Sequence, residues 1–590
     1  MIRVADYIAR ALVEHGIRDV FMVTGGAAMH LNDAIGRNKD LAYICCHHEQ
    51  ACAMAAASYY RLSNRLAAIN VTAGPGGTNA ITGVFGAFVE SLGMVVVSGQ
   101  VKFETTVRST NLPLRQLGDQ EIDITRIVAP ITKYAVMLTD PNTVRHHVEK
   151  AIHLAREGRP GPVWLDVPMN VQGAMIDPDA QEGFTPDAAP LPVHDAARIH
   201  ELVARAERPV IFAGSGIRLA GGEEEFVKLA DRWNVPVVTG FNAHDLLWHE
   251  HPCNIGRQGT IGDRAGNFAV QNADFLLIIG SRLTIRQLSY NWENFAPHAF
   301  KVVVDVDEAE LRKPTIKADL PVHADARDLL HALNALPKPP AHDEWLQWCQ
   351  ARKERYPVVL PEYANDPRGV NPYVFAKRLF ELLPDDAIVV TGDGTACVTT
   401  FQAAQLKRGQ RLYSDGGCAP MGFDLPGAIG ACIAARRKRV VCLAGDGSIQ
   451  MNIQELQTMA TNQLPISIFV LNNDGYLSIR LTQKNFFPDN PVGAGPESGV
   501  GIPDFARIAA AYGIDYASAR TDEELDAAIR ATIDARGPTM CEMFLDPEQP
   551  FAPKTSSRRL PDGRMVSAPL EDMFPFLDRD ELEQNTIRKT

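Results

Sequence analysis

The segment 439–476, RVVCLAGDGSIQMNIQELQTMATNQLPISIFVLNNDGY, constrains the fold more than any other part of the chain. The apolar runs 439–443 and 466–471 have the length of buried strands, and the residues between them carry apolar side chains at helical spacing. The pattern predicts one right-handed βαβ crossover, which places two parallel strands in one sheet. The apolar face of its helix is expected to comprise Met451, Ile453, Leu456 and Met459.

Both strands of this crossover end in polar residues and glycine. Asp446 follows the first strand and Asn473 follows the second, 27 positions later, so both lie at the carboxyl edge of the sheet, where α/β proteins bind ligands. Carboxylate, amide and carbonyl oxygens suit Mg²⁺ or Ca²⁺ rather than Zn²⁺. A helix that begins near Ser448 offers N–H groups to phosphates. The motif predicts a metal that holds a diphosphate; a plain turn with a capping Asp is the alternative.

Strand-like and helical segments alternate along the whole chain, which predicts an α/β fold with mostly parallel central sheets covered by helices. Linker-like stretches at 176–193 and 336–342 divide the chain into three consecutive domains. The predicted bounds are 1–180, 190–335 and 365–550, with a tail at 551–590. The segments Gly158–Pro168 and Arg536–Pro547 both read as a Gly-Pro turn and a strand, which indicates that the first and third domains are related.

Composition limits the partners and the location of the chain. The formal net charge of −13 argues against non-specific binding of nucleic acid or an anionic membrane. No apolar run is long enough to span a bilayer, and the N-terminus is amphipathic rather than a signal peptide, so we expect a cytoplasmic protein. The 10 cysteines form no Cys-x-x-Cys pair, and burial is favoured over a redox role for Cys45-Cys46.

An acidic residue far upstream, Glu49, follows a predicted strand and begins an Ala-rich helix. Tight packing of such a helix would bury the carboxyl group, and burial raises the pKa of a carboxyl, which suits acid–base chemistry. The alternative is a helix N-terminal carboxylate stabilised by the helix dipole. The sequence His-His-Glu-Gln-Ala is not H-E-x-x-H, so it does not predict zinc.

Gly-Asp-Gly followed at this spacing by Asn-Asn resembles the metal–diphosphate motif of thiamine-diphosphate (ThDP) enzymes. The segments 22–35, 70–83 and 158–168 resemble the first domain of the acetolactate synthase-like members, and the resemblance covers about residues 1–550. It implies a pyrimidine-binding domain at 1–180, a central domain at 190–335 and a diphosphate-binding domain at 365–550. The tail is a candidate active-site lid.

The resemblance also implies roles for single residues. Asp446, Asn473 and the Gly475 carbonyl would hold Mg²⁺, and Glu49 would bond the aminopyrimidine N1′ of ThDP. Gln120, in the segment 116–123, is the second predicted catalytic residue. Met421 is a further predicted cofactor contact, whose bulk would bend ThDP into a V shape. The remaining predicted cofactor contacts are Gly26, Ala27, Thr72, Gly394, Thr395, Ala396, Ala419, Gly445, Gly447, Ser448 and Tyr476. Thr395-Ala396 departs from the Gln-His that the family usually has there.

The middle segment 209–222 holds an incomplete dinucleotide motif. Gly214 and Gly216 supply the first two glycines of G-x-G-x-x-G, but the third position is Leu219. The segment 256–283 resembles the FAD-carrying middle domain of acetolactate synthases, which implies FAD in a structural role. Arg282 and Arg286 are candidate FAD contacts, and ordinary surface arginines are the alternative.

The resemblance implies an enzyme that decarboxylates pyruvate and transfers the two-carbon unit to a carbonyl acceptor. Its active sites would lie at the subunit interface of a homodimer or homotetramer. Thr482 stands where acetolactate synthases have a Trp that selects the acceptor, and the tail carries basic residues at 558, 559 and 564. Both departures favour a larger ketone, such as the keto-deoxysugar nucleotide of the yersiniose-type branch. The alternatives are acetolactate formation from two pyruvates, a 2-keto acid decarboxylase, and a non-catalytic binding or assembly protein.

Overall fold

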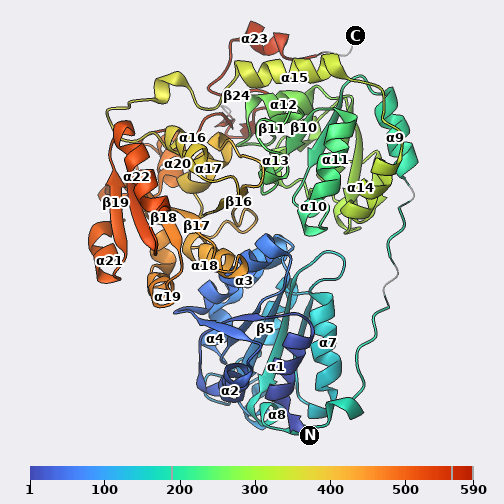
Figure 1. Ribbon diagram of the computed structural model, residues 1–590, viewed down its shortest axis with the longest axis vertical. Coiled ribbons are helices and arrows are strands. Elements are labelled where there is room, and N and C mark those ends of the chain that lie inside the picture. Colours follow the sequence, from blue (N-terminus) through green and yellow to red (C-terminus); the bar gives the residue numbers. More distant parts are fainter. Residues whose placement is uncertain (188–189, 194, 560–561, 588–590) are drawn as a thin grey trace.

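The computed structural model describes residues 1–187, 190–193, 195–559 and 562–587, and it consists of three α/β domains (Figure 1). Each domain is built on a six-stranded sheet in which every strand pair is parallel. The central strands are buried along nearly their whole length because helices cover both faces of each sheet. The predicted α/β fold is therefore confirmed. Among the helices of the described ranges, none has the length and apolar character needed to cross a bilayer.

The first and third domains have the same strand order. Numbered within each domain, both sheets run 2-1-3-4-6-5. The strands of the first sheet, in chain order, are β2 (Asp19–Met22), β3 (Ala42–Cys45), β4 (Ala68–Val71), β5 (Met94–Gln100), β6 (Tyr134–Met137) and β7 (Pro162–Pro168). Those of the third are β15 (Ile388–Thr391), β16 (Arg411–Tyr413), β17 (Val440–Gly445), β18 (Ile466–Asn472), β19 (Asp515–Ala519) and β20 (Thr539–Phe544). The two Gly-Pro turns lead into β7 and β20, which hold the same place in the two sheets, in agreement with the predicted relationship.

The middle sheet has the order 3-2-1-4-5-6, which is that of doubly wound dinucleotide-binding domains. Its strands, in chain order, are β9 (Pro209–Ala213), β10 (Val237–Thr239), β11 (Asn254–Arg257), β12 (Phe275–Ile279), β13 (Phe300–Asp305) and β14 (Leu320–His323). The segment 336–342 only connects α14 (Ala326–Ala335) to α15 (Asp343–Arg355), and α15 packs on α12 (Arg264–Gln271). The middle unit therefore extends beyond the predicted boundary at 335.

One helix pair joins the first domain to the third. Helix α3 (Glu49–Ser63) packs on α18 (Asp424–Ala434), and each helix follows the second strand of its own sheet. A Cβ on Gly430 would lie 2.0 Å from the Ala55 carbonyl oxygen, and Ser58 Oγ donates to the Gly427 carbonyl at 2.6 Å. Ala55 and Gly430 both lie six residues after the first residue of their helix. Topologically equivalent helices thus cross at equivalent positions, and the tight packing predicted for the Ala-rich helix is confirmed.

The C-terminal tail lies against the middle domain. Its strand β21 (Lys554–Thr555) pairs with β24 (Met573–Phe574), and Asn267 of α12 donates to the Leu570 carbonyl at 2.9 Å. The side chains of residues 558 and 559 fall outside the described residues, whereas Arg564 is exposed and pairs with Asp562 at 2.7 Å. The lid role of the tail stays a prediction.

Candidate active site

Asp446 lies at the carboxyl end of β17 with 1% of its surface exposed. Its Oδ1 accepts the Gly447 N–H at 2.7 Å, and its Oδ2 accepts the N–H groups of Gly475 at 2.9 Å and Asn473 at 3.2 Å. Burial raises the pKa of Asp446 to about 6, against the opposing effect of these N–H donors. The structure therefore brings the three predicted metal ligands into direct contact.

Asn473 connects this turn to the neighbouring one. Its Nδ2 donates to Thr395 Oγ1 at 2.8 Å, which commits the amide nitrogen and leaves the amide oxygen as its ligand atom. Thr395 begins α17 (Thr395–Ala403) after Gly394, whose φ is 67°. The predicted diphosphate loop, 394–396, thus lies beside the Asp446 turn, because β15 and β17 are adjacent strands.

The donor set of this turn fits a Mg²⁺ ion bound to phosphate. One carboxylate, one amide oxygen and one backbone carbonyl leave coordination positions for phosphate oxygens and water. Within the part of the chain that the structure describes, no three or more His, Cys, Asp or Glu side chains gather in a metal-binding group. A site that depends on three protein carboxylates or thiolates is therefore not found there.

The segment after the turn differs from the predicted helix. It forms a 3₁₀ helix, η11 (Ile449–Asn452), followed by the short helix α19 (Glu455–Thr461). The prediction that Met451 lies on the apolar face is wrong, since 46% of its surface is exposed. The physical reason is that a 3₁₀ helix has about three residues per turn, so the 3.6-residue phase breaks before α19 begins.

Gly447 and Ser448 stabilise the shape of the Asp446 turn. A Cβ on Gly447 would lie 2.2 Å from the ring of Tyr476, so only glycine fits there. Ser448 Oγ donates to Asp424 Oδ2 at 2.6 Å and accepts the Gly422 N–H at 2.9 Å. The Ser448 hydroxyl therefore ties the Asp446 turn to the start of α18, and its contact with a phosphate stays a prediction.

Met421 lies in the loop between β16 and α18 with 36% of its surface exposed. Met421 is therefore not a residue of the hydrophobic core. Ala419 has a φ of 52°, and its N–H donates to the Asp415 carbonyl at 2.9 Å, which shapes the loop. An apolar side chain that is partly open beside the Asp446 turn is suited to contact a flat ring of a ligand.

Glu49 is the first residue of α3 and is 9% exposed. Its Oε2 accepts from Asn79 Nδ2 at 3.0 Å. Thr72 Oγ1 is buried and has no hydrogen-bond partner among the described residues. A Cβ on Gly76 would lie 2.9 Å from Thr72 Cγ2 and 3.7 Å from Glu49 Oε1, so both side chains surround that glycine. A buried carboxyl near an unpaired hydroxyl fits a polar ring such as an aminopyrimidine.

Gln120 and the segment 26–27 lie at the same edge of the first sheet. Gln120 is exposed with a φ of 58°, and its carbonyl oxygen would lie 2.3 Å from a Cβ on Gly74. Gly26 begins the 3₁₀ helix η1 (Gly26–Ala28) after β2, and a Cβ there would meet no atom within 4 Å. The Ala27 carbonyl accepts from Gln172 Nε2 at 2.7 Å. The structure therefore places these predicted contacts at the sheet edge where Glu49 also lies.

Two residues that sequence reasoning missed connect the two halves. Asn452 Nδ2 donates to Gln50 Oε1 at 3.0 Å and to the Gly422 carbonyl at 2.8 Å. Glu455 Oε1 accepts the His47 N–H at 3.0 Å. The only signal for either residue is its place in the MNIQEL segment after the Gly-Asp-Gly turn. Gln50 and His47 lie 402 and 408 positions away in the sequence, so no local pattern reveals these contacts.

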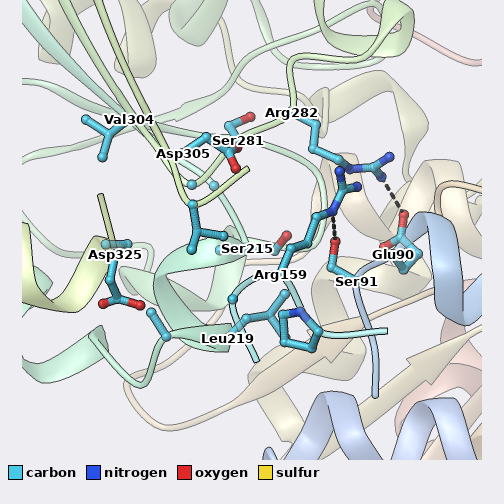
Figure 2. A pocket seen from close by; sticks show the side chains of 18 of the residues that line it. Glu90, Ser91, Arg159, Ser215, Leu219, Ser281, Arg282, Val304, Asp305 and Asp325 are labelled. Atoms are coloured by element: carbon cyan, nitrogen blue, oxygen red, sulfur yellow. Dashed lines mark hydrogen bonds and ion pairs between the residues drawn. The ribbon is translucent and has the colours of Figure 1, made fainter. Parts of the chain in front are cut away.

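A cavity of about 1000 Å³ lies at the point where the strand order of the middle sheet reverses (Figure 2). All four candidate FAD residues, Gly214, Gly216, Arg282 and Arg286, line it. The first domain contributes Arg159, which donates to Ser91 Oγ at 2.8 Å and pairs with Asp307 at 2.9 Å. The position is the one at which doubly wound sheets bind nucleotides.

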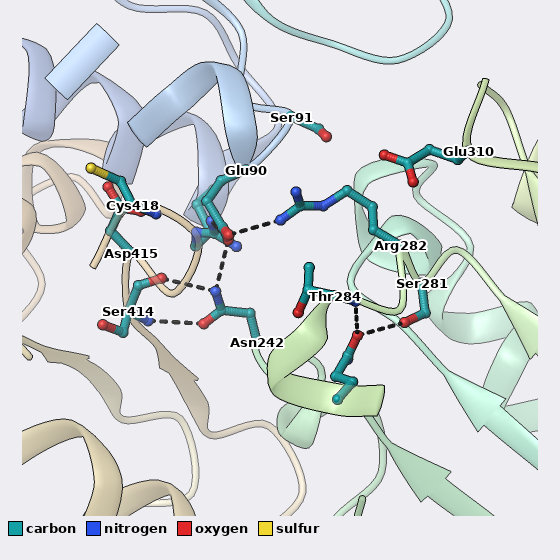
Figure 3. A network of polar contacts seen from close by, with 12 residues as sticks. Glu90, Ser91, Asn242, Ser281, Arg282, Thr284, Glu310, Ser414, Asp415 and Cys418 are labelled. Atoms are coloured by element: carbon teal, nitrogen blue, oxygen red, sulfur yellow. Dashed lines mark hydrogen bonds and ion pairs between the residues drawn. The ribbon is translucent and has the colours of Figure 1, made fainter. Parts of the chain in front are cut away.

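A polar network joins this cavity to the loop that carries Met421 (Figure 3). Glu90 is buried and accepts from Arg61 at 2.6 Å, from Asn242 at 2.9 Å and from Arg282 at 3.2 Å. Burial opposes its ionisation, but the two arginines outweigh burial and lower the pKa of Glu90. Asn242 also donates to the Ser414 carbonyl at 2.9 Å. All three domains thus meet at Glu90.

Two domains have equal topology here, one with an oxygen-ligand turn and the other with a buried glutamate at the start of a helix, as expected for the two-sided cofactor site of a ThDP enzyme. Family comparison agrees along the chain. The N-terminal TPP binding domain of thiamine pyrophosphate enzymes matches residues 2–127, the central domain matches 196–333 and the C-terminal TPP binding domain matches 392–543. The chain therefore belongs to the thiamine pyrophosphate enzyme family and is an enzyme of the carboligase type.

Its relatives include acetolactate synthases from distant organisms. The isozyme 1 large subunit of Escherichia coli is 30% identical over 555 residues, which cover 93% of this chain and 95% of that protein. The probable large subunit of Methanocaldococcus jannaschii is 30% identical over 591 residues (95% and 94%), and acetolactate synthase 2 of Zea mays is 31% identical over 572 (94% and 87%). The predicted family, fold and ThDP are confirmed, whereas these relatives give no support to the deoxysugar branch.

Proposed function

We propose that this protein is a Mg²⁺- and ThDP-dependent carboligase that condenses two pyruvates to acetolactate with loss of CO₂. The acetolactate synthases that it resembles are matched over nearly their whole length, which favours pyruvate as acceptor over the predicted keto-deoxysugar. The observation that carries the proposal is the Asp446 turn, where Asn473 and Gly475 meet a buried carboxyl.

The residues on the Asp446 side have binding roles in this proposal. Asp446 Oδ, Asn473 Oδ1 and the Gly475 carbonyl would bind Mg²⁺, and the backbone N–H groups of 394–396 and 447–448 would bind the diphosphate. A bound metal would keep Asp446 ionised although burial favours its neutral form. Met421 would support the rings from its half-exposed position.

The residues on the Glu49 side act on protons in this proposal. When bound, ThDP supplies an acidic ring carbon and an electron-accepting thiazolium, which let a 2-keto acid lose CO₂. Glu49 would hold a proton at N1′ of the aminopyrimidine, and Asn79 fixes the orientation of its carboxyl group. Gln120, on its exposed loop, would reach the substrate rather than the cofactor.

The Glu49→Gln variant tests the catalytic assignment. We expect the rate of pyruvate consumption to fall at least about 100-fold, the scale of a lost acid–base group, while ThDP stays bound and is found by mass spectrometry. Glu14→Gln, on the exposed surface of the same domain, should leave the rate unchanged. Normal turnover by Glu49→Gln would refute the role of Glu49. Asp446→Ala should lose ThDP altogether.

A larger ketone acceptor is the second candidate, and Thr482 favours it. Thr482 lies on α20 (Leu477–Phe486), is exposed and donates to the Ser478 carbonyl at 2.9 Å. Incubation with pyruvate and a keto-deoxysugar nucleotide, followed by product mass, distinguishes the candidates. Acetolactate as sole product, with the ketone unconsumed, would exclude the second one.

We propose that FAD occupies the cavity of the middle domain in a structural role. A Cβ on Gly214 would lie 2.1 Å from the Gly280 carbonyl oxygen, so glycine keeps the two cavity loops in contact. Arg282 and Arg286 supply positive charge for a diphosphate. The yellow absorbance of the purified protein tests this proposal, and a colourless protein that binds no added FAD would refute it.

We propose a homodimer or homotetramer with active sites between subunits. Support comes from two groups of exposed apolar side chains near the site. Leu112, Leu114 and Leu117 precede Gln120 in the sequence, whereas Ile479, Phe486, Phe487 and Val492 lie on or after α20. Mixing Glu49→Gln with Asp446→Ala subunits tests the arrangement. Sites shared between subunits should recover about a quarter of the activity, because half the dimers then hold one intact site of two. No recovery would place each site within one chain, through the contact of α3 with α18.

A further inference from the structure

A second cavity, of about 590 Å³, lies between the middle and third domains. Its walls come from β11 and the loop before it, from α15 and from the end of α17, and none of the candidate ThDP or FAD residues lines it. A volume of this size accommodates a ligand of metabolite size. The cavity has no role in the carboligase reaction proposed above.

The ammonium group of Lys353, on α15, lies in the wall of this cavity. It donates to the carbonyls of His249 at 2.7 Å and Asn254 at 2.8 Å. An ammonium has three N–H donors, and no carboxylate of the described residues lies within ion-pair distance of this one. Burial lowers the pKa of Lys353 to about 8, as expected for a cation without a paired anion.

Two further cations line the same cavity. Arg257 uses its Nη atoms to donate to the carbonyls of Gln402, at 2.7 Å, and Ala404, so its guanidinium joins the middle domain to the third. Lys377, on α16 (Pro372–Leu382), also lines the cavity. Burial lowers the pKa of His249 to about 3, and Lys353, Arg257 and Lys377 all add to that effect. His249 is therefore a neutral N–H donor in a cationic environment.

The carboxylates of the described residues near the cavity form no ion pair with these cations, although the charge of Asp263 opposes the lowering of the pKa of Lys353 and of Arg257 by burial. Both oxygens of Asp263 accept backbone N–H groups, from Arg257 at 2.8 Å and from Gly266 at 2.7 Å. Glu250 and Glu354 are exposed, and neither forms an ion pair with the residues that the structure describes. A half-buried ammonium that lacks a paired carboxylate is unfavourable, so the Lys353 side of the cavity has a physical preference for an anion.

We propose that this interdomain cavity binds a small organic phosphate, whose phosphate group contacts Lys353 and His249. A planar carboxylate is best bound by a free guanidinium, and the guanidinium of Arg257 is committed to backbone carbonyls. The remaining donors are point charges and an imidazole, which suit the tetrahedral oxygens of phosphate. The volume beyond the phosphate leaves room for the organic part.

Equilibrium dialysis of radiolabelled inorganic phosphate against the full-length protein tests the proposal. The protein is first saturated with ThDP and Mg²⁺, so that the Asp446 turn does not contribute. We expect one saturable site per chain and at least tenfold weaker binding by Lys353→Met. Lys228→Met, at a 57% exposed position of the same domain, is the control and should bind phosphate normally.

His249→Glu is the second variant, and it places a negative charge in the cavity without removing the Lys353 bonds. It should also weaken phosphate binding at least tenfold. This variant tests the phosphate site if Lys353→Met does not fold. Absence of saturable binding, or unchanged binding by both variants, would overturn the proposal. Equal competition by citrate would overturn the choice of phosphate. ThDP binding should be unchanged throughout, so failure here does not bear on the carboligase.

Discussion

The side-chain amide of Asn452, in the third domain, lies 3.0 Å from the Gln50 oxygen in the first domain. The same nitrogen lies 2.8 Å from the Gly422 carbonyl. Gln50 is next to the candidate acid–base residue Glu49, and Gly422 is next to Met421. One buried amide therefore connects the neighbours of two predicted cofactor contacts, Glu49 and Met421.

Replacing Asn452 by Ala should impair turnover more than folding. Both hydrogen bonds disappear, and each is worth roughly 0.5–1.5 kcal/mol, so we expect about a tenfold loss in kcat from the misplaced Glu49. Steady-state rates with pyruvate measure this effect. Gln457→Ala, an exposed position on α19, should behave as the wild type. Equal kcat for both variants would remove Asn452 from a positioning role.

Gly430→Ala should loosen the contact between the first and third domains. The added Cβ would clash with the Ala55 backbone, and overpacking of this kind costs roughly 1–3 kcal/mol. We expect a lower Tm by calorimetry. Gly36→Ala is a matched control, because Gly36 is helical with open space around it, and alanine there should stabilise by about 0.5–1 kcal/mol.

Asp415 should make stability depend on pH. Burial, and then the charge of Glu90, raise the pKa of Asp415 from 3.8 to about 7. The folded state therefore binds a proton that the unfolded state releases, so this contribution to stability is present at low pH and is lost as the pH rises from about 4 to 7. Asp415→Asn should consequently raise stability at pH 8, on the order of 2–4 kcal/mol, and change little near pH 4.

Thermal unfolding of the Asp415→Asn variant at several pH values measures this effect. Asp386→Asn is the control, since that exposed carboxylate pairs with Lys438 and its pKa is lowered rather than raised. It should give no stabilisation at pH 8. A gain by Asp415→Asn that is equal at all pH values would contradict the titration of Asp415.

Arg282→Met should reduce both flavin content and stability. The variant removes positive charge from the middle-domain cavity and one of the cations beside the buried Glu90. We expect at least tenfold less flavin per chain and a lower Tm, because the Glu90 charge is then less well compensated. Arg312→Met, at a 69% exposed position of the same domain, should change neither. Full flavin content in Arg282→Met would exclude Arg282 as a contact.

Local pattern was sufficient to predict one half of the candidate site. Asp446 and Asn473 follow adjacent strands of a single crossover, so their proximity follows from strand topology alone. Asn452 could not be assigned in the same way, because its partner Gln50 lies in the first domain, 402 positions away. The exposure of Met451 was missed because apolar spacing does not distinguish an α-helix from a 3₁₀ turn followed by a helix.

In the middle domain, an incomplete dinucleotide-binding motif correctly predicts the loop that lines the cavity. Gly214 and Gly216 are needed because Gly280, at the end of the neighbouring strand, packs directly against both. The third glycine of the motif is replaced by Leu219, which lines the cavity instead. The strand order, and not the motif, therefore identifies the domain as one that can bind a nucleotide.

The crossing of α3 and α18 has a consequence for the origin of the chain. Equivalent helices that meet at equivalent residues form an isologous contact, as two copies of one domain do about a twofold axis. The first and third domains therefore have the geometry of a homodimer whose two subunits are joined in one chain. The covalent connection holds the two domains together whatever the protein concentration. Once fused, the copies no longer had to remain identical. One now carries Glu49 and the other Asp446, a division of labour that a symmetric dimer of a single domain cannot have.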